Sequence, residues 1–263
     1  MESRTIRGVM ALALAATALI AAHAGIVQQT GQYASSQGKP QIVSRLTLTS
    51  GTNPEDTLLL VQYPLKSQTP ITKYVATQGE PLHIIIVRDD FFGFGHLHPQ
   101  MSPGGVFRLP ISLEQNHRYY VYVESQPAGM PEQVFRYVLQ SSAPPVHLTT
   151  TIVAPRVSAA VGPYVVSLDQ QKLHANRAQT LTVDINRSRN APGITPFHVP
   201  WVQAVLVNTS TLAYADVDSA VNQGICCQYA LHLPALSRGL YRMWLQFNDG
   251  QTTYTTPFTF AAR

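Results

Sequence analysis

The chain has 263 residues and a formal net charge of +4, and only 12% of its residues are charged. Lysine and arginine form no run, so neither the composition nor the charge pattern indicates a nucleic-acid-binding protein. A chain of this length is long enough for two ordinary domains with hydrophobic cores.

The first 24 residues have the features of a cleaved bacterial export signal. Two arginines precede a small apolar stretch over residues 8–22, and an A-x-A cleavage site follows at residues 22–24. An apolar stretch of this length is shorter than the roughly 20 residues needed to span a bilayer. We therefore expect a signal peptide over 1–24 and a periplasmic or secreted mature chain from Gly25, without a transmembrane segment. An uncleaved membrane anchor is the alternative.

The mature chain has the composition of an all-β protein. Residues 25–41 are polar and small, which predicts a flexible leader. From Ile42 on, runs of Val, Ile, Leu, Thr and Tyr are bounded by turn residues, and no helical period is seen. We expect two tandem immunoglobulin-like or fibronectin-like β-sandwiches. The first covers residues 42–145, a linker covers 146–161, and the second covers 162–263.

The two predicted sandwiches form an internal repeat. A shift of 120 residues places Ile84–Val87 on Ala204–Val207 and preserves the apolar pattern. Farther along the chain the shift is 122, so that Tyr122 falls on Trp244. In the second copy, the three histidines of the first copy are replaced as follows: His83 by Gln203, His96 by Asp216 and His98 by Asp218.

The histidines of the first copy are the candidate site. Residues two apart on a strand point to the same face, so His96 and His98 project together. If a hairpin closes at Asp89-Asp90, then His83 faces His96 across it. Three imidazoles on one face are a ligand set for Zn²⁺, Cu²⁺ or Ni²⁺.

Neighbouring residues extend this hypothesis. Met101 follows Pro99 by two positions and offers a thioether, and a soft sulfur favours copper, particularly Cu(I), over zinc. Asp89 and Asp90 are candidates for a carboxylate ligand or for an acceptor of a ring N–H. The alternative is that the histidines are structural and only form hydrogen bonds.

The histidine segment resembles a group of largely uncharacterised bacterial exported proteins. Their β-sandwich units carry a Leu-His pair, an apolar strand and an Asp-x-x-x-Phe-x-His-x-His-Pro pattern. The matching positions in this chain are Leu82, His83, Ile84–Val87, Asp90, Phe94, His96, His98 and Pro99. The resemblance implies repeated β-sandwiches and a histidine site, but no defined activity. The second copy departs from the pattern at every histidine.

Other chemistry is less well supported by the sequence. The adjacent Cys226 and Cys227 cannot join distant parts of the fold to each other, and a vicinal ring, thiols, a bond to another chain and metal binding all remain open. No Ser-His-Asp arrangement with a nucleophile elbow, no paired carboxylates and no nucleotide-binding glycine loop is found. We therefore expect no enzyme, no catalytic residues and no organic cofactor.

Three functional hypotheses follow. The first is an exported protein that holds or delivers copper, or alternatively zinc, through His83, His96 and His98 with Met101 as an auxiliary ligand. The second is a non-catalytic, envelope-associated module that binds a protein or glycan, with structural histidines. The third is a metalloenzyme that uses an open coordination position. A cupredoxin-type barrel is an alternative fold for the first unit, but its last strand, Val134–Gln140, lacks the expected cysteine.

Overall fold

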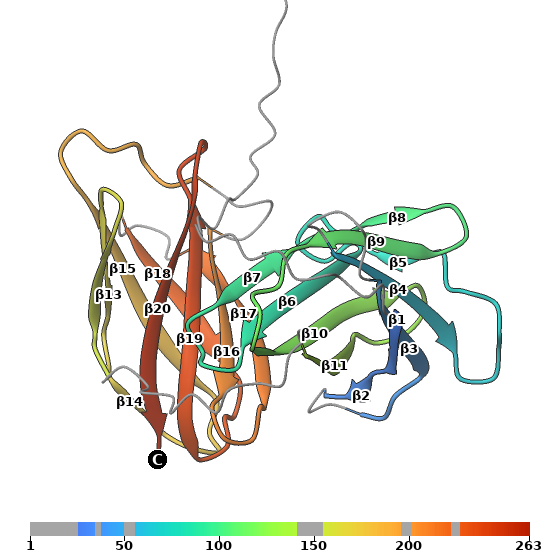
Figure 1. Cartoon of the computed structure of the whole chain (residues 1–263). Helices are drawn as coiled ribbons and strands as arrows, with labels where there is room; N and C mark the ends of the chain where they lie inside the picture. Colours follow the sequence, from blue (N-terminus) through green and yellow to red (C-terminus); the bar gives the residue numbers. More distant parts are fainter. Residues whose placement is uncertain (1–25, 35–37, 50–55, 141–154, 196–200, 222–226) are drawn as a thin grey trace, which may run out of the picture.

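The structure is a computed structural model, and it describes residues 26–34, 38–49, 56–140, 155–195, 201–221 and 227–263 (Figure 1). Within these ranges the chain forms twenty strands and no helix, so the all-β prediction is confirmed. Accordingly, no helix suited to crossing a membrane occurs among these residues. The expected signal peptide over 1–24 and Cys226 lie outside the described residues.

Strands β1 to β11, the first set, form two sheets that face each other. The strands are β1 (Ile26–Thr30), β2 (Gln32–Tyr33), β3 (Ile42–Thr49), β4 (Asp56–Pro64), β5 (Tyr74–Val75), β6 (Leu82–Arg88), β7 (Phe94–Leu97), β8 (Gln100–Ser102), β9 (Val106–Ile111), β10 (Arg118–Pro127) and β11 (Gln133–Gln140). One sheet has the order β1-β3-β4-β9-β8, and the other has the order β2-β11-β10-β6-β7 with β5 paired to β10. Leu46 and Leu60 of the first sheet share a core with Ile84 and Val121 of the second. The first set is therefore a β-sandwich.

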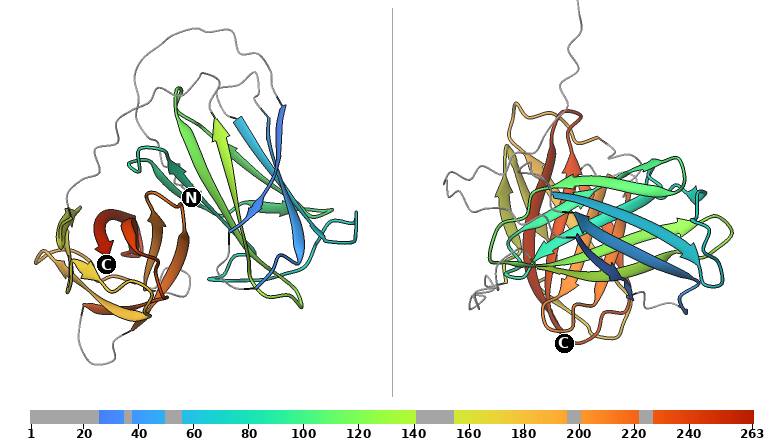
Figure 2. Two further views of the ribbon diagram at one scale, coloured as in Figure 1. Left: turned by 90° about the horizontal axis from the view of Figure 1, so that it is seen from below. Right: turned by 45° about the vertical axis from the view of Figure 1, so that its right-hand side comes forward.

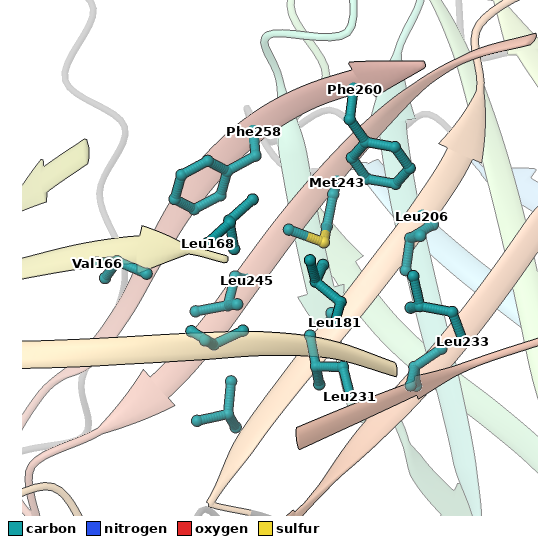
Figure 3. Packing of buried hydrophobic residues seen from close by; sticks show 14 of the residues in the cluster. Val166, Leu168, Leu181, Leu206, Leu231, Leu233, Met243, Leu245, Phe258 and Phe260 are labelled. Atoms are coloured by element: carbon teal, nitrogen blue, oxygen red, sulfur yellow. The ribbon is translucent and has the colours of Figure 1, made fainter. Parts of the chain in front are cut away.

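Strands β12 to β20, the second set, form one sheet in the order β12-β13-β15-β18-β17-β16-β19-β20-β14. The strands are β12 (Ser158–Val161), β13 (Tyr164–Leu168), β14 (Lys172–Leu173), β15 (Gln179–Arg187), β16 (Val202–Asn208), β17 (Tyr214–Val221), β18 (Gln228–Leu233), β19 (Gly239–Asn248) and β20 (Thr253–Ala262). The early part of β17 pairs with β16 and its last three residues pair with β18, so β17 turns the corner between two layers. Leu181 and Leu231 of one layer pack with Leu206 and Met243 of the other (Figure 3). The packing is sandwich-like, as predicted.

The N-terminal segment differs from the flexible leader expected over 25–41. Residues 26–30 and 32–33 are edge strands, since β1 pairs with β3 and β2 pairs with β11. Short polar strands are common at sheet edges, where one side of the strand remains unpaired. The second set begins at Ser158, before the expected boundary at residue 162. Of the linker expected over 146–161, residues 146–154 lie outside the described residues.

The two sets lie side by side (Figure 2). Residues of β6 and β10 in the first set share a buried hydrophobic cluster with residues of β16 and β19 in the second. Alternate residues of β6 face opposite ways, so Ile84 joins the sandwich core while Ile85 and Val87 face the second set. We call this contact the seam. Its buried residues are Ile85, Val87, Phe91, Tyr122, Val205, Val207 and Trp244. Burial on both faces explains why β6 is apolar along almost its whole length.

Candidate metal centre

His83 and His96 lie on the two strands of one antiparallel hairpin. β6 pairs with β7 such that Ile85 is opposite His96 and Val87 is opposite Phe94. The predicted hairpin is therefore present, but the predicted register, with His83 opposite His96, is wrong by two residues.

The register differs because the turn is longer than the two residues predicted. The N–H of Arg88 donates to the carbonyl of Gly93 at 2.9 Å, so residues 89–92 form a four-residue loop. Phe91 has a φ of 60°, and its N–H donates to the carbonyl of Arg88 at 2.8 Å. A two-residue type I′ turn would need positive φ at both aspartates, whereas this loop needs it at Phe91 alone.

The three imidazoles converge as predicted, because a shift of two residues leaves every side chain on its original face. His83 Nδ1 lies 3.0 Å from His96 Nε2, and His98 Nε2 lies 3.3 Å from the same atom. One ring nitrogen of each histidine lies within 4.8 Å of the other two. Among the described residues, this is the only group of three or more His, Cys, Asp or Glu side chains arranged to hold a metal ion.

A backbone carbonyl fixes the position of the proton on His83. The Nε2 atom lies 2.8 Å from the carbonyl oxygen of Thr77. A carbonyl oxygen only accepts, so Nε2 carries the hydrogen, and Nδ1 of the neutral ring directs a lone pair at His96. The His83 side chain is buried, and this burial lowers the pKa of His83 below its usual value. The neutral form, which is the form that binds metals, is favoured.

A glutamine of the second set fixes the proton on His96. The Nδ1 atom lies 2.9 Å from Oε1 of Gln246, while Nε2 of Gln246 donates to the hydroxyl of Thr255 at 3.0 Å. The second bond orients the amide so that its oxygen faces the imidazole, which assigns the hydrogen to Nδ1 and a lone pair to Nε2. Metal-binding histidines are usually supported in this way, through an oxygen that accepts from the outer ring nitrogen.

The inner nitrogens of His83 and His96 are both acceptors in these tautomers, which favours a donor or a positive charge near them. When both outer nitrogens carry hydrogens, the neutral rings direct two lone pairs at each other across 3.0 Å, and these repel. A proton, a metal ion or an N–H of His98, whose Nε2 lies 3.3 Å from His96 Nε2, reduces this repulsion. Metal–nitrogen bonds of about 2.0–2.1 Å in tetrahedral geometry place the ligand nitrogens about 3.3 Å apart. The two distances to His96 Nε2, 3.0 and 3.3 Å, are close to this value, and the ligand nitrogens of His83 and His98 lie within 4.8 Å of each other.

Met101 lies on a different sheet from the histidine hairpin. It is on β8, opposite Phe107 of β9, in the five-stranded sheet of the first set. The chain passes from one sheet to the other at Pro99, directly after His98. The side chain of Met101 is 37% exposed. Its predicted role as an auxiliary ligand therefore rests on closeness in sequence alone.

The two aspartates of the turn have partners other than the three histidines. Asp89 Oδ1 lies 2.9 Å from Nδ1 of His117, and Asp89 Oδ2 accepts from the N–H of Arg118. Asp90 forms an ion pair with Arg88 at 2.7 Å. These groups lie at the end of β6 that is remote from the cluster. The structure thus assigns both carboxylates to the turn.

Sequence reasoning missed the two groups that orient the rings. Thr77 acts through its backbone oxygen, which carries no sequence signal. Gln246 is separated from His96 by 150 residues. The only available signal was that Gln246 is a polar residue near the end of β19, where its neighbours Leu245 and Phe247 are apolar and buried.

The positions that the predicted repeat aligns with the histidines form an acidic cluster. Gln203 Nε2 donates to Asp216 Oδ2 at 2.9 Å, and the Tyr214 hydroxyl donates to Glu124 at 2.9 Å. Burial, followed by the charge of Asp218, raises the pKa of Asp216 to about 7. A cavity of about 620 Å³ adjoins Asp216 and Glu124. Carboxylates and an amide replace the imidazoles here, so the predicted nitrogen-ligand site is confined to the first set.

Comparison with known proteins gives no activity for the chain. Residues 159–263 match a domain of unknown function, DUF8832. No curated protein matches the chain. The matched range begins within β12 and covers the rest of the second set, and it contains none of the three clustered histidines. The similarity therefore concerns the second set of strands, whereas the candidate metal centre lies in the first.

Proposed function

We propose that this protein is an exported metal-binding protein that holds or delivers a copper or zinc ion through His83, His96 and His98. The export part of the proposal is supported by the signal-like sequence over residues 1–24. The metal part is supported by three imidazole nitrogens that lie within 4.8 Å of one another. The proposed role is binding rather than catalysis, with the ion as cargo.

One observation carries the proposal. The outer nitrogens of His83 and His96 both face oxygen acceptors, at 2.8 and 2.9 Å, while their inner nitrogens face each other at 3.0 Å. Histidines that only stabilise a fold commonly donate from one nitrogen and accept from a donor at the other. Here the two acceptor nitrogens face each other, and a nitrogen of His98 lies 3.3 Å from that of His96, which is an arrangement that suits a ligand set.

The donor atoms also bear on the choice of metal. Three imidazole nitrogens without sulfur suit Zn²⁺ and Cu²⁺. Cu²⁺ lies above Zn²⁺ in the general order of divalent-metal affinities, so we expect the site to bind Cu²⁺ more tightly. A preference for Cu(I) would require a soft ligand such as Met101.

The exposure of the site fits a role in holding or delivering the ion. His96 and His98 are partly exposed, whereas His83 is buried. Three protein ligands leave one position of a tetrahedral ion open. An ion bound on this face is accessible to a further ligand from a donor or acceptor protein.

Metal titration of the mature chain from Gly25 tests the proposal. We expect one Cu²⁺ or Zn²⁺ ion per chain in competition with a chromogenic chelator, and no such binding by the His96→Ala/His98→Ala double variant. His174→Ala, which removes an exposed histidine of the second set, serves as the matched control and should bind like the wild type. Absence of binding at micromolar metal, or equal binding by the double variant, refutes the proposal.

A second candidate is a non-catalytic interaction module with structural histidines and an envelope protein or glycan as its partner. The hydrogen bond between His96 and Gln246 favours it, because this bond links the two sets of strands. In this case the protein binds no metal, and the double variant is less stable than the wild type in the presence of a chelator. Unfolding measured alongside the titration separates the two functions.

A further inference from the structure

The second set contributes a residue to the histidine cluster although it has none of the clustered histidines itself. Gln246 lies on β19, is 8% exposed, and faces Nδ1 of His96 at 2.9 Å. The contact joins residues 150 positions apart. This hydrogen bond connects the ligand set to the second set of strands.

A second contact beside it fixes the same pair of strands. The ring of Phe94 stacks on Trp244, with centroids 4.8 Å apart. Phe94 precedes His96 by two residues on β7, and Trp244 precedes Gln246 by two residues on β19. The two contacts therefore have the same spacing on both strands, so the stack holds β7 in the position where His96 meets the amide.

We propose that the second set completes the metal centre: Gln246 is a positioning residue for His96, and metal binding and docking of the two sets of strands stabilise each other. This inference rests on the proposed metal-binding function. It assigns to the second set a part in metal affinity that does not follow from its own sequence.

The chain of hydrogen bonds gives the physical reason. The hydroxyl of Thr255 accepts from Nε2 of Gln246, which directs Oε1 at the imidazole. An acceptor at Nδ1 holds the ring in one orientation and makes Nε2 a stronger metal ligand. Loss of such a partner typically lowers metal affinity 10–100-fold. By thermodynamic linkage, a metal that binds more tightly when the sets are docked favours docking by the same factor.

The test compares Zn²⁺ affinity of full-length mature variants by chelator competition, with the absorption spectrum of bound Co²⁺ as a report on coordination geometry. Gln246→Leu removes the acceptor, and Gln246→Glu restores an acceptor oxygen at the same place. Gln251→Leu makes the same apolar change at an exposed position after β19 and serves as the control. Thr255→Val removes only the group that orients the amide.

We expect Gln246→Leu to bind Zn²⁺ 10–100-fold more weakly and to show an altered Co²⁺ spectrum, while Gln246→Glu and Gln251→Leu stay near wild type. Thr255→Val should show a smaller loss, and it provides the measurement if Gln246→Leu does not fold. Wild-type affinity in both Gln246→Leu and Thr255→Val overturns this inference alone. Absence of Zn²⁺ binding by the wild type overturns the proposed function itself.

Discussion

The ring of Phe94 on β7 stacks on the indole of Trp244 on β19, with centroids 4.8 Å apart and planes 13° apart. A second stack crosses the same seam, where Tyr214 of β17 stacks on Tyr122 of β10 at 4.6 Å and 16°. The predicted repeat aligns Phe94 with Tyr214 and Tyr122 with Trp244. The stack of Phe94 on Trp244 therefore corresponds, with the two sets interchanged, to the stack of Tyr214 on Tyr122. This is the reciprocal pattern of an isologous interface. The internal repeat itself stays a prediction, and this reciprocity is the geometry that a duplicated unit packed on its own copy would have.

Trp244→Ala is expected to destabilise the protein strongly. Trp244 is 1% exposed and lies in the seam, and removal of a buried tryptophan costs about 3–5 kcal/mol. Trp201, the only other tryptophan, is half-buried at the margin of the second-set core, so Trp201→Ala should cost less. Urea denaturation of both variants measures the difference in the free energy of unfolding. A loss for Trp244→Ala no larger than that for Trp201→Ala would show that the seam stabilises the protein no more than the margin of the second-set core does.

The sequence predicts which face each side chain occupies better than it predicts register. Alternation in β6 and β7 depends only on the period of two, so His83, His96 and His98 are correctly placed together despite the error of two residues. The register depends on the length of the turn, and that length depends on Phe91 adopting a positive φ, which is uncommon for a bulky residue. Nothing in the composition of the turn indicates this.

Other features depend on tertiary contacts that the sequence does not encode locally. The composition of residues 26–33 predicts a polar leader. In the structure, β1 and β2 are strands because they pair with β3 and β11. Gln246 becomes part of the candidate site only because the seam places β19 beside β7. Both depend on partners more than a dozen residues away, which explains why local pattern does not reveal them.

Metal binding should stabilise the folded protein. A ligand that binds only the native state adds about 2.7 kcal/mol to the free energy of unfolding at a free concentration 100 times its Kd. We expect Zn²⁺ or Cu²⁺ to raise the melting temperature of the wild type and a chelator to reverse the effect. His98→Ala should show a much smaller increase. The same increase in His98→Ala and in the wild type would mean that the metal binds elsewhere.

Met101→Leu should leave the affinities for Cu²⁺ and Zn²⁺ within about twofold of the wild type. Leucine has a similar volume, so the substitution mainly removes the sulfur. Met101 lies on β8 with a partly exposed side chain, in the sheet opposite to that of the histidine hairpin. Titration with Cu(I) under reducing conditions provides the sharper comparison. A selective tenfold loss of Cu(I) affinity would identify Met101 as a ligand after all.

The pair formed by Gln203 and Asp216 predicts a pH-dependent stability. Gln203 Nε2 donates to Asp216 Oδ2 at 2.9 Å, but Gln203 Oε1 and Asp216 Oδ1 are buried and accept no hydrogen bond from the described residues. A proton on Asp216 supplies a donor to this group of acceptors. Burial and the nearby charges of Asp218 and Glu132 raise the pKa of Asp216 to about 7 from a usual value of 3.8.

The sign of the effect follows from this raised pKa. The native state binds the proton more tightly than the unfolded state, so the contribution to stability is complete below about pH 4 and is lost as the pH rises to about 7. Burial also raises the pKa of Asp218 and of Glu124, which act in the same direction.

Asp216→Asn removes one of these titrations and keeps the shape of the side chain. Denaturant unfolding between pH 4 and pH 8 should therefore show a smaller decline in stability for Asp216→Asn than for the wild type, and an exposed control, Asp169→Asn, should follow the wild type. A decline of wild-type size in Asp216→Asn would mean that the Asp216 carboxyl binds its proton equally well in the native and unfolded states and does not cause the pH dependence.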